Sequence, residues 1–267
     1  PLKRAGLDWE TLHEKYPKLV YGYVSGYGEK GPDKDLPGFD FTAFYARGGI
    51  LGPLRDKNSL PMLTVQGFGD HQVAMNLAAG VLAALFKAKM TGEGDHVVVS
   101  LFHSAIWDIS LMLQASQYGA DSTQYPMERW KLGNPLVLCY ETADGQWLQI
   151  AMPQYDRHYP ILMNAMGYPE LADDARYYPQ KNLIPNREEF SAWITAEFKK
   201  KTCDEWCKLL DANDLPYAIA QEWDSLLEDK QAWASDCFYE MSYSNGNKRT
   251  LVRPPVLFDQ MGLPPYE

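Results

Sequence analysis

The chain has 267 residues, of which 46% are hydrophobic, so it is long enough to bury a sizeable core in one large domain or two modest ones. Its formal net charge of −10 argues against a general nucleic-acid binder, because neutralising phosphates requires clustered basic residues that are not visible here. An anionic ligand would therefore need a local basic pocket.

The cysteines and the apolar runs indicate whether the protein has disulfides, a metal site or a membrane span. The cysteines are few and scattered, which predicts reduced thiols rather than a disulfide framework or a metal site: Cys139, Cys203, Cys207 and Cys237. No apolar run approaches the roughly 20 residues of a membrane span, and the N-terminus carries no signal-peptide pattern. We therefore expect a cytoplasmic protein without a metal and without a membrane partner.

The first part of the chain predicts alternating helix and strand. Residues 8–15 are typical of a helix, and residues 19–27 have the aromatic and β-branched content of a strand. Residues 29–38 are rich in charge, proline and glycine, which predicts a surface loop. Residues 41–47 are a second helical segment that ends at a pair of glycines.

A long helix is predicted from His71 to Met90, which contains strong helix formers and no proline. Four apolar positions spaced four apart predict one packed face: Val73, Leu77, Val81 and Leu85. Together with the alanines, they predict a largely buried helix. A glycine-rich turn at 91–94 ends it, and residues 97–101 then read as a fully buried strand, so the pair resembles half of a parallel α/β unit.

The second part predicts a mixture of hairpins and helices. Residues 137–141 and 146–152 flank Ala143-Asp144-Gly145, which is a hairpin signal. Helices are expected at 156–166, 187–200, 203–211 and 222–234, and a strand at 216–221. Residues 237–243 and 249–252 form a second hairpin pattern around Asn245-Gly246.

These patterns suggest an α/β large domain with a smaller α+β module inserted late. We expect part of the large domain at 1–118, a linker at 119–136, a small α+β domain at 137–221, and a linker returning toward the large domain at 222–267. The first residues read as the interior of an α/β unit, so we expect the chain to be a fragment with an incomplete large domain.

Asp70 directly precedes the predicted long helix, where an aspartate can act in two ways. As an N-cap it accepts hydrogen bonds from the free N–H groups of the first turn, and this is the usual role of a Gly-Asp helix start. The helix dipole also favours the ionised carboxylate, which suits a nucleophile that attacks an acyl carbon. Gly69 leaves room for a substrate, and nearby N–H groups can stabilise an oxyanion.

The sequence around this aspartate resembles the family III CoA transferases, which include formyl-CoA and carnitine CoA-transferases. The resemblance rests on Asp70 to Leu85 and on Lys89 to Gly94, and four further segments match in the family's order: Leu2–Glu10, Tyr16–Val20, Ser25–Pro32 and Pro37–Phe41. The segments GYGEKGPDKDLPGFD and GDHQ look most like those of transferases for (R)-2-hydroxy acids, such as 2-hydroxyisocaproate or phenyllactate. This resemblance implies a role in amino-acid fermentation.

The resemblance implies a fold and a mechanism. The fold is a Rossmann-like large domain with an inserted smaller domain, and two subunits interlock as a homodimer. The substrates are an acyl-CoA and a carboxylic acid, with coenzyme A as a co-substrate and no tightly bound cofactor. The family's nucleophile falls on Asp70, which forms first a mixed anhydride and then an aspartyl-CoA thioester. Covalent catalysis of this kind suits the transfer, because the energy of the thioester is kept in each intermediate and is not lost to water.

The resemblance also implies binding residues. CoA contacts fall on Arg4 and Ala5, and an arginine there can pair with a phosphate, although an exposed helix charge is the plain alternative. Candidates for the substrate pocket are Gly38, Asp40, Gly69, Gly133 and Asn134. The last two lie where formyl-CoA transferase has a glycine-rich loop, of which this sequence keeps a single glycine.

Two other functions remain open at this point. The α-methylacyl-CoA racemase branch shares the aspartate but needs a histidine where this chain has Phe39, and phenylalanine cannot move a proton. A non-catalytic CoA-binding protein would use Asp70 only as a cap. The aromatic run can line an acyl pocket or belong to the core, and we favour the core: Phe39, Phe41, Phe44 and Tyr45.

Overall fold

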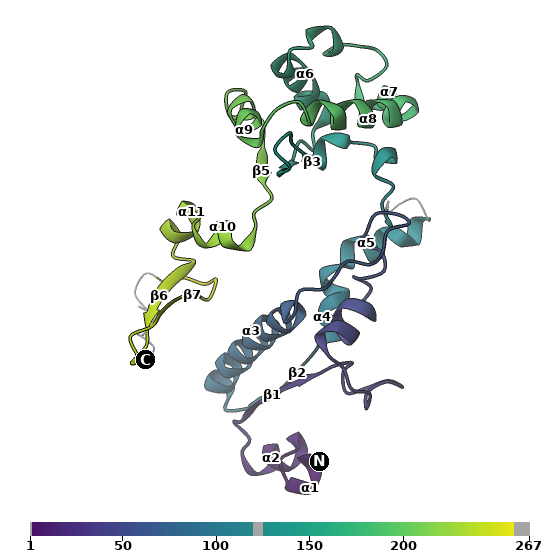
Figure 1. Cartoon of the computed structure of the whole chain (residues 1–267). Coiled ribbons are helices and arrows are strands. Elements are labelled where there is room, and N and C mark those ends of the chain that lie inside the picture. Colours follow the sequence, from purple (N-terminus) through teal and green to yellow (C-terminus); the bar gives the residue numbers. More distant parts are fainter. Residues whose placement is uncertain (1, 120–124, 259–267) are drawn as a thin grey trace. The chain divides into compact units, whose positions relative to one another are not determined.

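The computed structural model describes residues 2–119 and 125–258, so the predictions for residues 1, 120–124 and 259–267 lie outside the described residues. The chain divides into two compact units, residues 1–132 and residues 133–267, which are described separately (Figure 1). The division falls inside the predicted linker at 119–136. The predicted domain boundaries themselves remain predictions.

The first unit is built around a long helix and two parallel strands. Its elements are α1 (Leu2–Ala5), α2 (Trp9–Lys15), β1 (Val20–Ser25), the π-helical turn η1 (Asp40–Ala46), α3 (Phe68–Thr91), β2 (Asp95–Ser100), α4 (Leu101–Asp108), α5 (Ser110–Ala115), and the short 3₁₀ turns η2 (Ser116–Tyr118) and η3 (Arg129–Lys131). β1 and β2 pair in parallel from Val20 opposite Asp95 to Ser25 opposite Ser100. The predicted parallel α/β unit is therefore confirmed.

One face of α3 packs on this two-stranded sheet. A Cβ added to Gly80 would lie 2.6 Å from Val97 Cγ1, and one added to Gly22 would lie 3.3 Å from Leu77, so glycines let the helix approach the strands closely. Val73, Ala84 and Ala88 are buried on this helix. The inward face thus follows the 3.6-residue period of the helix.

The expected burial of α3 and β2 is wrong in two respects. Leu85 is exposed, because a strict four-residue repeat drifts by about 120° between positions 73 and 85 of a helix with 3.6 residues per turn. Outward-facing Leu82 and Phe86 are exposed as well, since a two-stranded sheet covers a single helix face. Of the β2 residues only Ser100 is buried, so β2 is not the fully buried strand that we expected.

Helix α3 also contradicts the expectation that no apolar run approaches the length of a membrane span. It has 24 residues and is long and apolar enough to cross a membrane, judged by length and composition only. A single helix of this kind is weak evidence for a membrane span. One apolar face of α3 packs against β1 and β2. The fold therefore accounts for part of the apolar composition of this helix.

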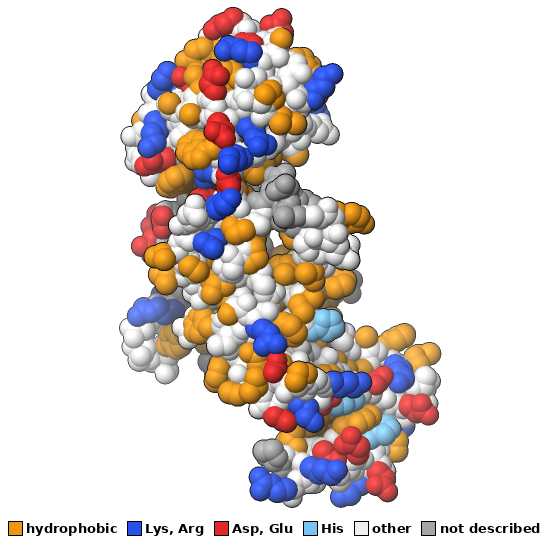
Figure 2. Space-filling model, turned by 90° about the vertical axis from the view of Figure 1, so that its right-hand side faces the viewer, with side chains coloured by type: hydrophobic (Ala, Val, Ile, Leu, Met, Phe, Trp, Pro, Cys, Tyr) orange, Lys and Arg blue, Asp and Glu red, His pale blue; other side chains and the backbone are white. Residues whose placement is uncertain are grey.

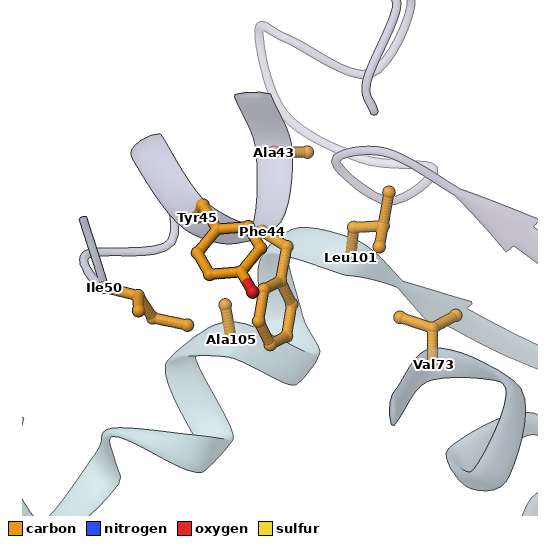
Figure 3. Close-up of a cluster of buried hydrophobic side chains, with 7 residues drawn as sticks. All are labelled: Ala43, Phe44, Tyr45, Ile50, Val73, Leu101 and Ala105. Atoms are coloured by element: carbon orange, nitrogen blue, oxygen red, sulfur yellow. The ribbon is translucent and has the colours of Figure 1, made fainter. Parts of the chain in front are cut away.

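A compact apolar cluster joins η1 to α3 and α4 (Figure 3). The cluster consists of Ala43, Phe44, Tyr45, Ile50, Val73, Leu101 and Ala105. The Phe44 side chain is fully buried, and Figure 3 places its ring between Ala105 of α4 and Val73 of α3. This cluster fixes η1 beside the first turns of α3, because close-packed side chains resist displacement.

The second unit combines a three-stranded antiparallel sheet, a separate hairpin and several helices. Its elements are η4 (Pro135–Val137), β3 (Cys139–Glu141), β4 (Trp147–Ile150), α6 (Tyr155–Met166), η5 (Pro169–Leu171), α7 (Gln180–Leu183), η6 (Ile184–Asn186), α8 (Arg187–Phe198), α9 (Cys203–Asp211), β5 (Tyr217–Ile219), α10 (Trp223–Leu227), α11 (Lys230–Ala234), β6 (Phe238–Ser242) and β7 (Lys248–Val252). The sheet order is β3-β4-β5.

Both predicted hairpins and the strand at 216–221 are confirmed; the strands are slightly shorter than predicted, except that β7 begins one residue earlier, at Lys248. The predicted helix at 222–234 is instead two short helices, because the chain leaves the helix after Leu227 and Asp229 caps a new one at Lys230. Aromatic rings pack in the core beside the three-stranded sheet: Phe198 stacks on Tyr140 at 4.6 Å and lies tilted against Trp206 at 4.5 Å, measured between ring centroids.

The η1 cluster predicts different stabilities for two phenylalanines of the same turn. Phe44→Ala empties a fully buried site and should lower the free energy of unfolding of the complete protein by about 3–5 kcal/mol. Phe41→Ala, at a side chain that is 47% exposed, is the matched control and should cost less than about 1 kcal/mol. Urea unfolding followed by circular dichroism measures both, and equal losses would contradict the packing described here.

Candidate active site

The first turn of α3 differs from the prediction at the position of Asp70. The helix begins at Phe68, after Gly67 turns the chain with φ of 80°, and its first hydrogen bond runs from the His71 N–H to the Gly67 carbonyl at 3.0 Å. Asp70 is therefore the third residue of the helix and not its N-cap. The residue that precedes the helix is a glycine, which has no side chain to cap with.

The cap comes instead from Asp40, at the start of η1. Asp40 Oδ1 accepts a hydrogen bond from the Gly69 N–H at 3.0 Å, and the Asp40 side chain is 5% exposed. A carboxylate in this position satisfies one of the free N–H groups of the first turn and interacts favourably with the helix dipole. Asp40, which we predicted as a pocket residue, thus serves first as a tertiary cap.

Two predicted pocket glycines allow the close contacts around this cap. A Cβ at Gly69 would lie 2.4 Å from Asp40 Oδ1 and 2.3 Å from the Phe44 ring, so no larger residue fits. A Cβ at Gly38 would lie 2.5 Å from the Cα of Gly26, which brings the loop before η1 against the end of β1. The structure therefore brings Asp40 and Gly69 together beside Asp70, whereas Gly38, two residues before Asp40, packs against Gly26.

The two carboxyl groups of this site influence each other. Burial raises the pKa of Asp40 above its ordinary value, and the negative charge of Asp70 raises it further, while backbone N–H groups of Gly67, Phe68 and Gly69 act in the opposite direction. Asp40 Oδ2 is buried and has no hydrogen-bond partner within the described ranges. The pair thus combines one buried carboxyl with one exposed carboxyl.

Asp70 itself is exposed at the free end of the helix, so a ligand can reach its carboxylate. Of the N–H groups that precede the first hydrogen bond of the helix, that of Gly69 donates to Asp40 and that of Phe68 donates to the Val65 carbonyl at 3.4 Å, which leaves the Asp70 N–H at the helix end. Helix N-termini of this kind stabilise negative charge. An exposed carboxylate at a helix N-terminus can attack an acyl carbon, and the N–H at that end can help to stabilise the oxyanion that forms.

The predicted CoA contacts lie at the other end of the same unit. Arg4 and Ala5 are exposed on α1, and the Tyr21 hydroxyl, at the amino end of β1, donates to the Leu7 carbonyl at 2.9 Å. The Gly94 N–H, just after α3, donates to the Pro17 carbonyl at 2.7 Å, so α1 and α2 neighbour the carboxyl end of α3 (Figure 1). About 30 Å of helix separates this end from Asp70.

The last two pocket candidates belong to the second unit. The Gly133 carbonyl accepts a hydrogen bond from Gln180 Nε2 at 2.9 Å, and no atom would obstruct a Cβ at Gly133. Asn134 Oδ1 accepts from the Leu136 N–H at 2.9 Å, and its Nδ2 donates to the Met152 carbonyl at 3.0 Å. The Asn134 amide is therefore engaged within its own unit, and a pocket role for either residue remains a prediction.

The aromatic run that we assigned to the core is divided between core and surface. Phe44 and Tyr45 are buried, as expected, but Phe39 is 66% exposed and Phe41 is 47% exposed, so the core assignment is wrong for these two. The reason is that the chain turns at η1, so some side chains of this short segment point into the core and others point to the surface. Phe68, in the first turn of α3, is also exposed.

Sequence reasoning missed the residues that shape the start of α3. Gly67 in its left-handed conformation sets where the helix begins, and the Tyr45 hydroxyl donates to the Val65 carbonyl at 3.3 Å, which holds the segment before it. The pattern Gly67-Phe68-Gly69 was a usable signal for an earlier helix start, because glycine is the residue that tolerates this backbone conformation.

Charge and metal-binding groups show little clustering. On the face in Figure 2, lysine and arginine side chains are scattered among acidic and apolar ones rather than gathered in one basic area. Across residues 2–119 and 125–258, no group of three or more His, Cys, Asp or Glu side chains is placed to hold a metal ion.

Comparisons with known proteins agree on one family. Residues 1–265 match CoA-transferase family III. The chain is 50% identical over 266 residues to the cinnamoyl-CoA:phenyllactate CoA-transferase of Clostridium sporogenes, covering 99% of this chain and 65% of that protein. It is 38% identical over 265 residues to the (R)-2-hydroxy-4-methylpentanoate CoA-transferase of Clostridioides difficile, covering 99% and 66%. The chain thus spans about two thirds of the length of these relatives.

Solved structures agree on the fold. The crystal structure of Rv3272 from Mycobacterium tuberculosis superposes with a TM-score of 0.83 at 24% identity, covering 97% of this chain and 68% of that one. A CaiB/BaiF family protein from Brucella suis superposes with a TM-score of 0.79 at 22% identity, covering 99% and 68%. By sequence and by fold, the chain belongs to CoA-transferase family III.

Proposed function

We propose that the complete protein transfers CoA from an acyl-CoA thioester to a free (R)-2-hydroxy acid with an aromatic or branched apolar side chain, such as phenyllactate or 2-hydroxyisocaproate. The observation that carries the proposal is the exposed carboxylate of Asp70 at the free N-terminus of α3 in a chain of this family. The names of the two relatives, which act on acids of this kind, support the choice of substrate.

The proposed reaction passes through two covalent intermediates on Asp70. The carboxylate attacks the thioester carbon, the C–S bond breaks, and a mixed anhydride and CoA thiolate result. The thiolate then attacks the Asp70 carbonyl carbon, which releases the donor acid and leaves an aspartyl-CoA thioester. The acceptor carboxylate displaces CoA to form a second anhydride, and thiolate attack on its acyl carbon gives the new acyl-CoA and free Asp70.

The start of α3 suits each of these steps. Every attack creates a tetrahedral centre whose oxygen becomes negative, and a helix N-terminus offers N–H groups and a favourable dipole at that place. The Asp40 carboxylate and the Val65 carbonyl accept from the Gly69 and Phe68 N–H groups, so the Asp70 N–H is the donor nearest to the nucleophile. No proton has to be supplied, because each step exchanges one anion for another.

We place the apolar side chain of the acid beside Asp70. Phe39 and Phe41 flank Asp40, whose carboxylate touches the first turn of α3, and Phe68 stands in that turn. All three rings are exposed in this structure, so an apolar ligand gains by covering them. Phe39 also occupies the position at which a racemase needs a base, which favours transfer over racemisation.

The remaining parts of the proposal rest on the family resemblance. They are a CoA nucleotide held by Arg4 and Ala5, with the thioester end at Asp70, a Rossmann-like large domain with an inserted smaller domain, an interlocked homodimer, a cytoplasmic location, and a role in amino-acid fermentation. CoA acts as a co-substrate and not as a resident cofactor.

The nucleophile is tested by Asp70→Asn in the complete protein. Because Asn keeps the size of Asp but cannot form the anhydride, transfer should fall by on the order of 10³-fold or more while the melting temperature changes little. Incubation of the wild type with acyl-CoA and hydroxylamine, followed by peptide mass spectrometry, should locate the modification at Asp70. Persistent transfer by the folded variant would exclude the covalent mechanism.

The substrate class is tested by Phe39→Ala. Removal of the ring should lower kcat/KM for phenyllactate by about 10-fold, because a lost apolar contact is worth about 1–3 kcal/mol, and should change kcat/KM for lactate little. Phe86→Ala, at an exposed phenylalanine about five turns after Phe68 on α3, is the matched control and should behave as the wild type. Equal effects on both acids would argue against an acyl pocket at Phe39.

The CoA site is tested by Arg4→Ala. Loss of a charge-assisted contact to a phosphate should raise KM for acyl-CoA by about 10-fold and leave KM for the acid unchanged. Lys3→Ala, at the neighbouring exposed basic residue, controls for a general loss of positive charge. Steady-state kinetics at two salt concentrations separate the two, and an unchanged KM in Arg4→Ala would remove Arg4 from the site.

A further inference from the structure

We propose that Asp40 is a positioning residue for the nucleophile: its buried carboxylate holds the first turn of α3 through the Gly69 N–H and thereby fixes the direction of the Asp70 side chain. The inference rests on the proposed function, because it assigns Asp40 a role in the acylation of Asp70. Asp40 does not touch the substrate and acts through the backbone of the helix.

The contact between Asp40 and Gly69 is direct and leaves no space for adjustment. Asp40 Oδ1 lies 3.0 Å from the Gly69 nitrogen, and Gly69 is the residue immediately before Asp70. A Cβ on Gly69 would lie 2.4 Å from the same oxygen. A displacement of the Asp40 carboxylate therefore displaces the peptide unit that carries the nucleophile.

Asp40 is itself held from several sides. The next residues of η1 are anchored in the core, where Ala43 and Phe44 are fully buried. On the other side, the Phe39 N–H donates to Thr42 Oγ1 at 3.0 Å, and Gly38 packs against Gly26 at the end of β1. The position of Asp40 is thus set by the core and by the sheet together, as a group that orients a reactive residue requires.

The second oxygen of Asp40 distinguishes this carboxyl from an ordinary helix cap. Oδ2 is buried and has no hydrogen-bond partner in the part of the chain that the structure describes. Burying such an oxygen without a partner is unfavourable, and a plain cap on the protein surface avoids it. The burial, together with the neighbouring Asp70 charge, raises the pKa of Asp40 above its ordinary value.

The other titratable groups around Asp40 are few. Tyr45 lies on the same turn, and its own pKa is raised first by burial and then by the Asp40 charge. Asp70 faces Asp40 from α3. Helix α4, which also packs against η1, carries His103 and Asp108, both exposed. Asp70 is therefore the charge that couples most closely to Asp40.

This coupling gives the positioning role a signature in the pH dependence. An ionised Asp40 accepts a stronger hydrogen bond from Gly69 than a protonated one, because charge assistance strengthens the bond. Acylation of Asp70 should therefore slow as the pH falls through the raised pKa of Asp40. Asp40→Asn keeps an oxygen that can accept from Gly69 but cannot titrate, so its acid limb should lie at lower pH.

The test measures single-turnover acylation of Asp70, trapped with hydroxylamine, in the complete protein. Asp40→Ala removes the acceptor and should slow acylation by on the order of 100-fold, with unchanged binding of acyl-CoA. Asp40→Asn should stay within about 10-fold of the wild type and shift the acid limb to lower pH. Asp35→Asn, at an exposed residue of the preceding loop, is the matched control and should match the wild type.

The outcomes separate the inference from the proposed function. If the wild type traps the label on Asp70 but folded Asp40→Asn keeps the wild-type acid limb, Asp40 is a structural cap only and the inference is wrong. If Asp40→Ala does not fold, the limb of Asp40→Asn decides alone. If the wild type itself is never labelled at Asp70, the proposed function fails and this inference fails with it.

Discussion

The hydrogen bond from the Gly69 N–H to the buried Asp40 carboxylate is the interaction on which the arrangement of the candidate site depends. It joins two segments that are 29 residues apart in sequence and makes a short turn act as the cap of a 24-residue helix. Because Gly67 has no side chain, the start of α3 would otherwise lack a side-chain cap. The site is therefore tertiary in origin, although its central residue lies on one helix.

The core below this contact explains why it can be so close. Phe44 fills the space between α3 and α4, and Gly69 leaves the room that the Phe44 ring and the Asp40 carboxylate occupy. Packing of η1 and capping of α3 are thus one structural solution. A chain that loses either the ring or the glycine loses the position of Asp40, and with it the orientation of the helix end.

The two neighbouring aspartates of the site differ in their exposure and in their contacts. Asp70 is exposed and available to a ligand, whereas Asp40 is 5% exposed and bonded to the backbone. Their environments differ although their residue types are the same, and burial raises the pKa of Asp40. In the reaction that we propose, this arrangement places the nucleophile in solvent and its support in the core.

The sequence by itself determined the family and most element types, and it predicted the role of Asp70. Local signals were sufficient for the hairpins around Gly145 and Gly246, because turn residues specify them directly. The extent of burial along α3 was misjudged, since it depends on how many strands cover the helix. The cap supplied by Asp40, the contact of Gly38 with Gly26 and the exposure of Phe39 were decided by the tertiary structure. Such contacts join residues far apart in the chain, and no local pattern encodes a distance across the fold.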